Sequence, residues 1–355
     1  MCNLICASAR CRRRDLWKGL NVSDAHRIAG VEIGGTKVAA MLWQDGVVID
    51  EVRVSTGDPD ATFERLFAGV GRWWETSPFQ ALGVGSFGPV TLDPLAKDFG
   101  CIRTTPKPGW TGTAVLPRLA RRFPCPIGIE TDVNAAALAE HRWGHGRGAD
   151  SLVYLTIGTG VGGGVLQGGR PLHGRLHPEL GHLLLRRQPG DDFAGTCVFH
   201  RDCVEGLLSG PALRARFKAD PAEVPASDPR WNVVVADLAA FLCVLLHSLA
   251  PNRILIGGGV GLGAPWIVER VPSAMVPLLG DYYPELDASA LAEMIKLPGL
   301  GVAAGPLGAI AIGLAALENS TRPDASRRVG ASTRSVMDTR DRDGDASPLG
   351  SRHLA

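Results

Sequence analysis

Ile157-Gly-Thr-Gly-Val-Gly-Gly-Gly164 places five glycines and a threonine directly after the apolar run Leu152–Ile157. Glycines allow the N–H groups of a loop to point at an anion, and a threonine hydroxyl adds a further donor. A plain hairpin between two strands needs fewer glycines. The stretch therefore favours a phosphate-binding hairpin, with a tight turn that holds no ligand as the alternative.

Two more glycine runs follow strand-like segments. Ile33-Gly-Gly-Thr-Lys37 separates the predicted strands Ile28–Ile33 and Lys37–Trp43, and Ile256-Gly-Gly-Gly-Val260 follows the strand Arg253–Ile256. The first run could bind phosphate or form a simple β-turn. The second offers bare backbone over which a base and a ribose could lie, or a turn only.

None of the three runs matches the P-loop pattern Gly-x4-Gly-Lys-Ser/Thr or a clean dinucleotide-binding Gly-x-Gly-x-x-Gly unit. Their spread over two halves of the chain resembles the actin-like ATPase (ribonuclease H-like) fold. That fold is α/β and has two lobes with mixed sheets and an intervening cleft. In it, one hairpin per lobe grips the phosphates and a third loop holds the adenosine.

Strand-like and helix-like segments alternate in the order expected for two such lobes. Further predicted strands are Val47–Val54, Ala81–Ser86 and Ile127–Glu130, and predicted helices are Ala61–Thr76 and Asn134–Trp143. We expect an N-terminal lobe of residues 28–122 with 303–318, and a C-terminal lobe of residues 123–302. Residues 1–27 and 319–355 have the composition of a disordered extension and a disordered tail.

Composition limits the class of protein. The chain has 355 residues, 45% of them apolar and 21% charged, with a net charge of +1. This is ordinary for a globular protein and favours neither nucleic acid nor a membrane surface as a partner. No convincing signal peptide precedes the first strand, so we expect a cytoplasmic protein whose eight cysteines include metal ligands rather than cystines.

The longest apolar stretch runs from Val233 to Ala250, about the length of a membrane span. Asp237 and His247 lie inside it, and Pro251 ends it before a strand, which favours a buried helix. Such a helix could also pack against a second subunit, so the sequence is compatible with both a monomer and a homodimer.

Asp132 follows the strand Ile127–Glu130 and precedes a helical segment. A carboxylate there can cap the helix, and the helix dipole favours its ionised form. It can also act as a general base that takes a proton from a sugar hydroxyl during phosphoryl transfer. The local sequence leaves both roles open.

Cys197-Val-Phe-His200-Arg-Asp-Cys203 brings three soft ligands into seven residues. His182 can complete a tetrahedral shell of two sulfurs and two nitrogens, which is typical of structural zinc. His177 is the alternative fourth ligand, and a Cys197–Cys203 disulfide or unliganded thiols are the other interpretations.

Taken in order, these segments resemble the ROK family of repressors and sugar kinases, and within it the bacterial fructokinases. The similarity covers residues 28–318. It rests on Gly30–Lys37, Gly85–Pro89, Thr104–Trp110, Glu130–Ala136, Gly158–Gly164, His177–His182, Cys197–Gly206 and Gly257–Gly259.

The resemblance implies a role for each matching position. Asp132 would be the catalytic aspartate, Glu179, His182 and Glu205 would contact the sugar, and magnesium would bridge the phosphates of ATP. The positions implied for ATP are Gly34, Gly35, Thr36, Lys37, Gly158, Thr159, Gly160, Gly257, Gly258 and Gly259. The zinc ligands would be His182, Cys197, His200 and Cys203, so the metal would fix the loop that carries the sugar contacts.

Three features resemble the fructokinase branch of the family and so imply fructose as the sugar that receives the phosphoryl group at O6. They are the Cys-x2-His-x2-Cys loop, Glu32 before the first glycine turn and the Thr104–Trp110 run. Thr131 stands where the family usually has Asn. A glucose, mannose or N-acetylmannosamine kinase is the main alternative, and a non-catalytic sugar sensor is a weaker one. We do not expect a repressor, because fewer than thirty residues precede the first strand.

Overall fold

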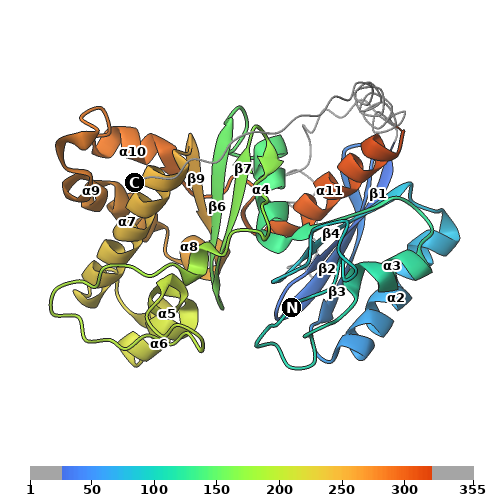
Figure 1. Cartoon of the computed structure of the whole chain (residues 1–355), viewed down its shortest axis with the longest axis horizontal. Helices are drawn as coiled ribbons and strands as arrows, with labels where there is room; N and C mark the ends of the chain where they lie inside the picture. Colours follow the sequence, from blue (N-terminus) through green and yellow to red (C-terminus); the bar gives the residue numbers. More distant parts are fainter. Residues whose placement is uncertain (1–25, 322–355) are drawn as a thin grey trace, which may run out of the picture. The chain divides into compact units, whose positions relative to one another are not determined.

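The computed structural model describes residues 26–321, whose strands form two five-stranded sheets (Figure 1). In spatial order the first sheet contains β3 (Val47–Ser55), β2 (Lys37–Gln44), β1 (Arg27–Ile33), β4 (Ala81–Ser86) and β5 (Ile127–Thr131). The second contains β10 (Ile295–Lys296), β9 (Arg253–Gly257), β6 (Ser151–Ile157), β7 (Val161–Gln167) and β8 (Arg170–Pro171).

The two sheets have the same connectivity. In the first, β2 is antiparallel to both β1 and β3, whereas β4 is parallel to both β1 and β5. In the second, β6 to β10 take the places of β1 to β5 in the same directions. The expected pair of related mixed sheets is confirmed, and the hairpins after β1 and after β6 occupy equivalent positions.

Helices cover the faces of both sheets. They are α2 (Pro59–Thr76), α3 (Val115–Arg122), α4 (Asp132–Trp143), α5 (Val204–Leu208), α6 (Gly210–Phe217), α7 (Arg230–Leu249), α8 (Gly258–Gly263), α9 (Pro265–Leu279), α10 (Ala288–Met294) and α11 (Ala304–Thr321). Single 3-10 turns are η1 (Leu180–His182), η2 (Pro221–Glu223), η3 (Gly280–Tyr282) and η4 (Gly301–Ala303).

Helix α2 packs on β2 and β3 of the first sheet. Its buried residues Phe63, Leu66 and Val70 recur at three- and four-residue spacing and so share one face of the helix. Asp58 caps the helix by accepting a hydrogen bond of 3.1 Å from the N–H of Ala61. The apolar periodicity that predicted this helix therefore corresponds to the face that packs on the sheet.

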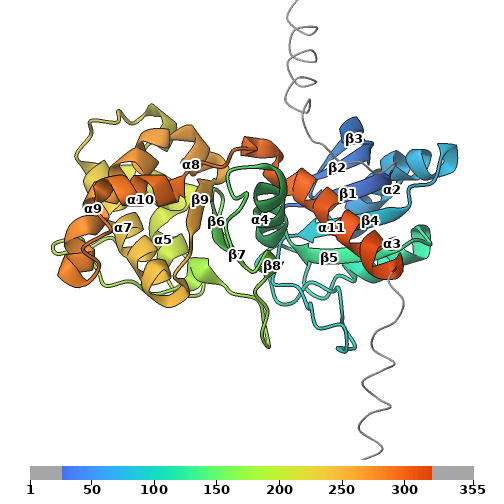
Figure 2. The same cartoon turned by 90° about the horizontal axis from the view of Figure 1, so that it is seen from above.

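Helix α11 covers the opposite face of the first sheet and runs beside β1 and β4 (Figure 2). The close approach depends on glycine: a Cβ at Gly83 would overlap the carbonyl oxygen of Ala309, and one at Gly308 would overlap that of Ala135. Helix α11 is thereby held against both β4 and α4. Helix α4 also contacts β6 and β7, so it lies between the two sheets.

The core of the second sheet contains α7, as the apolar stretch predicted. Leu238, Leu242 and Leu245 of α7 are buried in the same cluster as strand residues of β6 and β9. Two described helices, Arg230–Leu249 and Gly301–Thr321, are long and apolar enough to cross a membrane, but 56% and 61% of their apolar windows are buried inside the protein. Burial of this extent is what core helices show.

The structure differs from the expected organisation in two places. Strand β5 pairs in parallel with β4, so residues 127–131 belong to the first sheet and the expected boundary after residue 122 lies too early. The expected loose segments 1–27 and 319–355 lie almost wholly outside the described residues. Among the described residues, β1 begins at Arg27 and α11 continues to Thr321, so both elements extend slightly into the segments expected to be loose.

Candidate active site and metal centre

Two of the three glycine runs lie together at the edge of the second sheet. The cavity between them has a volume of about 440 Å³. It is lined by Gly158, Thr159, Gly210, Pro211, Arg214, Asp220, Pro221, Ala222, Val224, Trp231, Gly259, Val260, Gly263, Ala264 and Trp266. Helix α6 contacts the hairpin between β6 and β7. The N–H of Gly210, the first residue of α6, donates to the carbonyl of Gly158 at 2.7 Å. The run Gly257–Gly259, expected as a turn, instead begins the short helix α8 after Gly257 as its N-cap.

The equivalent hairpin of the first sheet does not line this cavity. The N–H of Gly34 donates to the carbonyl of Lys37 at 3.0 Å and so closes the turn. Gly35, Thr36 and Lys37 are exposed, and a Cβ at Gly35 would meet nothing within 4 Å. The backbone of this loop is therefore exposed and could contact a ligand from the side of the first sheet.

Asp132 is the first residue of α4 but not its cap. Thr131 caps the helix, since its hydroxyl accepts a hydrogen bond of 3.2 Å from the N–H of Asn134. The carboxylate of Asp132 accepts a hydrogen bond of 2.9 Å from the N–H of Val133. Burial raises the pKa of Asp132 to about 6, and the hydrogen bonds to backbone oppose this rise. The capping role weighed for Asp132 thus belongs to its neighbour.

Further carboxylates surround Asp132. Burial, together with the negative charge of Asp132, raises the pKa of Glu32 to about 7. Partial burial, with the charges of Asp132 and Glu205, raises that of Glu179 to about 7. Residues from β1, α4 and the 3-10 turn η1 are thereby brought into one electrostatic cluster, although they lie far apart in the sequence. Carboxyl groups whose pKa values are raised by burial and by a neighbouring negative charge are common at catalytic and ion-binding sites.

The predicted metal ligands converge. One ligand atom from each of His182, Cys197, His200 and Cys203 lies within 4.8 Å of all the others. The Sγ–Nδ1 distances are 3.8 Å for Cys197–His182, 3.9 Å for Cys197–His200 and 3.7 Å for Cys203–His182. Zinc bonded to sulfur at 2.3 Å and to nitrogen at 2.0–2.1 Å in a tetrahedron gives edges of about 3.6 Å. The donor set and its spacing fit zinc.

The geometry bears on two of the three alternatives for this cluster, the disulfide and His177 as a ligand. Cys197 and Cys203 are free thiols rather than a disulfide. His177 lies elsewhere: its Nε2 accepts a hydrogen bond of 3.2 Å from the N–H of Val90. His182, at the end of η1, is therefore the fourth member of the group.

The loop that carries the cluster is closed on itself. The N–H and C=O of Cys197 each pair with Arg201, at 3.1 and 3.0 Å. Gly195 and Arg201 adopt positive φ, and the N–H of Thr196 donates to the carbonyl of Gly206 at 3.0 Å. The backbone is thus shaped so that the side chains of one short loop point at a common centre.

Glu205 lies two residues beyond Cys203 and faces the glycine-rich hairpin. Its Oε2 accepts a hydrogen bond of 3.0 Å from the N–H of Val161. A Cβ at Gly160 would lie 2.6 Å from the same oxygen. In this structure the carboxylate expected to contact a sugar therefore also supports the hairpin.

The sequence model of the ROK family matches residues 28–316. The chain belongs to this family. Among its relatives, the fructokinase of Zymomonas mobilis is 39% identical over 292 residues, covering 81% of this chain and 96% of that protein. The fructokinase of Pediococcus pentosaceus is 37% identical over 297 residues, covering 82% and 99%.

A solved ROK hexokinase from Thermus thermophilus superposes on this ROK chain with a TM-score of 0.65 and 29% identity, covering 82% of this chain and 99% of that one. The actin-like ATPase fold is confirmed by this likeness and by the duplicated sheets.

Sequence reasoning missed several residues of this ROK chain that line the nucleotide-sized cavity. Trp266, from the start of α9, packs edge-on against Trp231 with ring centroids 4.9 Å apart. Arg214 and Pro211 come from α6. Helices α6 and α9 carry no local motif, and the sequence signal for α9 was a tryptophan three residues after the glycine-rich segment Gly257–Gly263.

Proposed function

We propose that this chain is an ATP-dependent fructokinase, which transfers the γ-phosphoryl group of ATP to O6 of D-fructose and gives fructose 6-phosphate. The observation that carries the proposal is Asp132, a partly buried carboxylate that begins α4 yet leaves the capping of this helix to Thr131. The relatives named fructokinase, aligned over most of the chain, support fructose as the sugar.

Asp132 is proposed as the general base. A base works best when its pKa lies near the operating pH, and a value of about 6 leaves the carboxylate ionised at neutral pH while keeping a useful proton affinity. It would accept the O6 proton as that oxygen attacks phosphorus. The proton then stays on the Asp132 carboxyl until solvent removes it, while ADP leaves.

Glu179, His182 and Glu205 are proposed to orient the sugar. Glu179 and His182 bracket η1, where the N–H of His182 donates to the carbonyl of Glu179 at 3.0 Å. Zinc held by the Cys/His group would fix this turn and the loop before Glu205. In this proposal the metal has a structural role and takes no part in the chemistry.

The nucleotide is proposed to occupy the cavity beside Gly158–Gly160, with its adenosine toward Gly257–Gly259 and its phosphates toward the hairpins. Gly34, Gly35, Thr36 and Lys37 would contact the phosphates from the first sheet. Magnesium would neutralise phosphate charge when bound with ATP. Glu32 would offer magnesium a carboxylate oxygen, the ligand type that this ion prefers, while Asp132 stays free to accept the sugar proton.

A coupled assay with a panel of hexoses tests the proposal. We expect turnover with ATP and fructose to exceed that with glucose, mannose and N-acetylmannosamine. Turnover confined to one of these other sugars would refute fructose and keep the kinase, whereas no turnover with any sugar would refute both. We also propose a cytoplasmic location, consistent with a protein that uses ATP and carries free thiols.

A further inference from the structure

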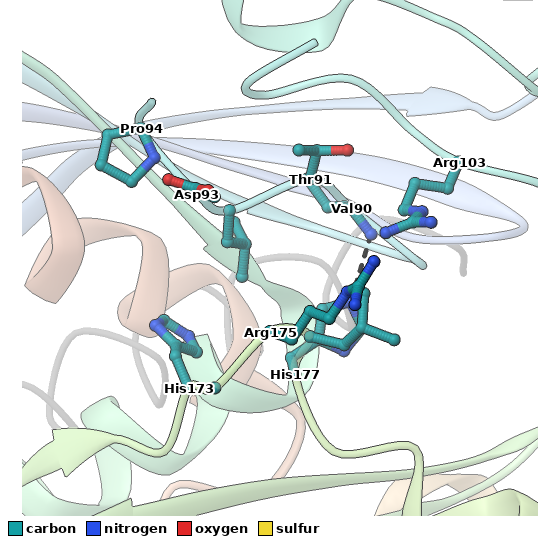
Figure 3. Close-up of a pocket in the computed structure, with 11 residues that line it drawn as sticks. Val90, Thr91, Asp93, Pro94, Arg103, His173, Arg175 and His177 are labelled. Carbon is teal, nitrogen blue, oxygen red and sulfur yellow. Dashed lines mark hydrogen bonds between the residues drawn. The ribbon is translucent and has the colours of Figure 1, made fainter. Parts of the chain in front are cut away.

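A second cavity, of about 240 Å³, lies away from the nucleotide pocket (Figure 3). One wall is the segment Val90–Pro94 with Arg103, and the other is the segment His173–His177. None of the residues proposed above for ATP, the sugar or zinc lines this cavity. Its walls come from segments that are some eighty residues apart, joined by the hydrogen bond from Val90 N–H to His177 Nε2.

The cavity has an excess of positive charge. Arg103 and Arg175 have no ion pair and no side-chain hydrogen bond within residues 26–321. Figure 3 shows that Arg103 belongs to the same side of the cavity as Val90, whereas Arg175 comes from the segment of His173 and His177. Two guanidinium groups that line one cavity give it a positive potential, which favours an anionic ligand.

His173 and Asp93, which also line the cavity, each have a partner in the structure. The ring of His173 is hydrogen-bonded to Glu130 at 3.1 Å, and this hydrogen bond raises the pKa of His173. The one carboxylate in the lining, Asp93, accepts from the N–H of Leu95 at 2.9 Å and keeps its second oxygen available. The pocket thus combines donors for an anion with an acceptor for a hydroxyl.

We propose that this cavity binds a hexose monophosphate, with the phosphate between Arg103 and Arg175 and a sugar hydroxyl on Asp93. Paired guanidinium groups bind phosphate oxygens in a fork geometry. Pockets for drug-sized ligands measure about 300–1,000 Å³, so 240 Å³ suits a ligand of monosaccharide size. The cavity shares no lining residue with the set proposed for catalysis, and its His177 contacts Glu179 of that set.

Occupation of this cavity would affect the sugar-binding segment. His177 lies two residues before Glu179 and contacts it, with Nδ1 and Oε1 3.5 Å apart. A phosphate held by both walls would add charge-assisted hydrogen bonds to the bond between Val90 and His177 that joins the walls. The ligand would therefore restrain the segment that leads into η1.

Isothermal titration calorimetry tests the site while the active site is filled with fructose and a non-hydrolysable ATP analogue. Fructose 6-phosphate is then titrated into the wild-type protein, into Arg103→Gln/Arg175→Gln and into the control Arg121→Gln/Arg147→Gln. The control arginines are also exposed and have no ion pair in the described part of the chain. Inorganic phosphate is titrated in parallel.

We expect one fructose 6-phosphate per wild-type chain, binding weakened at least about tenfold in the double variant and within twofold of wild type in the control. Weaker binding of inorganic phosphate, lost in the same variant, would show that the sugar adds contacts. The proposal is overturned if fructose 6-phosphate does not bind, if both double variants bind it equally, or if inorganic phosphate binds as tightly. Failure of fructose to bind the active site would be seen in a separate titration.

Discussion

The carboxylate of Glu205 and the N–H of Val161 are joined by a hydrogen bond of 3.0 Å. Glu205 lies two residues after the metal-ligand candidate Cys203, and Val161 ends the glycine-rich turn between β6 and β7. One side chain thus connects the loop of the Cys/His group to the hairpin proposed to hold phosphate. Sugar binding and nucleotide binding are expected to depend on each other through this contact.

Gly160→Ala tests the connection, because the new methyl group would lie 2.6 Å from Oε2 of Glu205 and displace it. We expect the KM values for both ATP and fructose to rise, each by about three- to tenfold, as one charge-assisted hydrogen bond is lost. Gly57→Ala, whose Cβ would approach only Arg65 at 3.8 Å, is the control. A rise in the KM for ATP alone would show that Glu205 does not serve both substrates.

Asp132→Asn tests the general base. We expect kcat to fall about 10²- to 10⁴-fold, the usual contribution of a positioned base, while calorimetry shows fructose binding retained. In the wild-type enzyme the base works when deprotonated, so kcat should fall as the pH drops through about 6. A pH profile that stays flat down to pH 5, with chemistry rate-limiting, would assign the proton transfer to another group.

The same substitution should stabilise the fold in a pH-dependent way. Because burial raises the pKa of Asp132 to about 6, its carboxyl favours folding below about pH 4 and this contribution is lost as the pH rises through 6. Asparagine has no charge to bury. We expect Asp132→Asn to melt about 2 °C above the wild type at pH 8, after a discount for solvent exposure, and level with it at pH 4. Equal melting at both pH values would contradict a buried charge.

The zinc ion proposed for the Cys/His group should stabilise the loop that carries its ligands. Inductively coupled plasma mass spectrometry of protein purified without chelator is expected to show about one zinc ion per chain. Cys197→Ser should lose this ion and lower the melting temperature, whereas Cys101→Ser, a free thiol outside the group, should keep both. Full zinc content in the Cys197 variant would show that the ion lies elsewhere.

The strands and hairpins of this chain could be predicted because their signals are local. Apolar runs bounded by glycine gave β1, β2, β6 and β9 within one or two residues of their observed bounds. The start of α8 was missed, since Gly257–Gly259 satisfies a turn and a helix N-terminus equally well by residue type. Which of the two forms depends on packing against β6, where Gly258 lies against the backbone of Ile157.

The candidate site was predicted in part for the same reason. Spacing identified the Cys-x2-His-x2-Cys loop, but it could not separate His177 from His182, which lie on either side of the same Pro-Glu-Leu-Gly segment. Thr131 and Asp132 are both common capping residues, and only the backbone geometry assigns the cap to Thr131. The walls of the nucleotide-sized cavity come from α6, α7 and α9, whose meeting is a property of the fold and of no single segment.

Trp266 offers a test of the proposed adenosine position. It lines the cavity together with Gly259, and its ring is held from two sides: Trp231 packs edge-on, and the guanidinium of Arg270 lies 4.7 Å from its centroid. A ring held this way can support a base by stacking or by apolar contact, worth about 1–3 kcal/mol for a base on an aromatic side chain. We therefore expect Trp266→Ala to raise the KM for ATP by about ten- to a hundredfold, with the KM for fructose unchanged.

The control for Trp266 is Tyr282→Ala, which removes a ring that is 76% exposed and does not line the cavity. Trp266→Phe, which keeps an aromatic face, should recover most of the affinity for ATP. Because Trp266 also packs on Trp231, melting curves must show that the Ala variant is folded at the assay temperature. An unchanged KM for ATP in a folded Ala variant would place the adenosine away from α9.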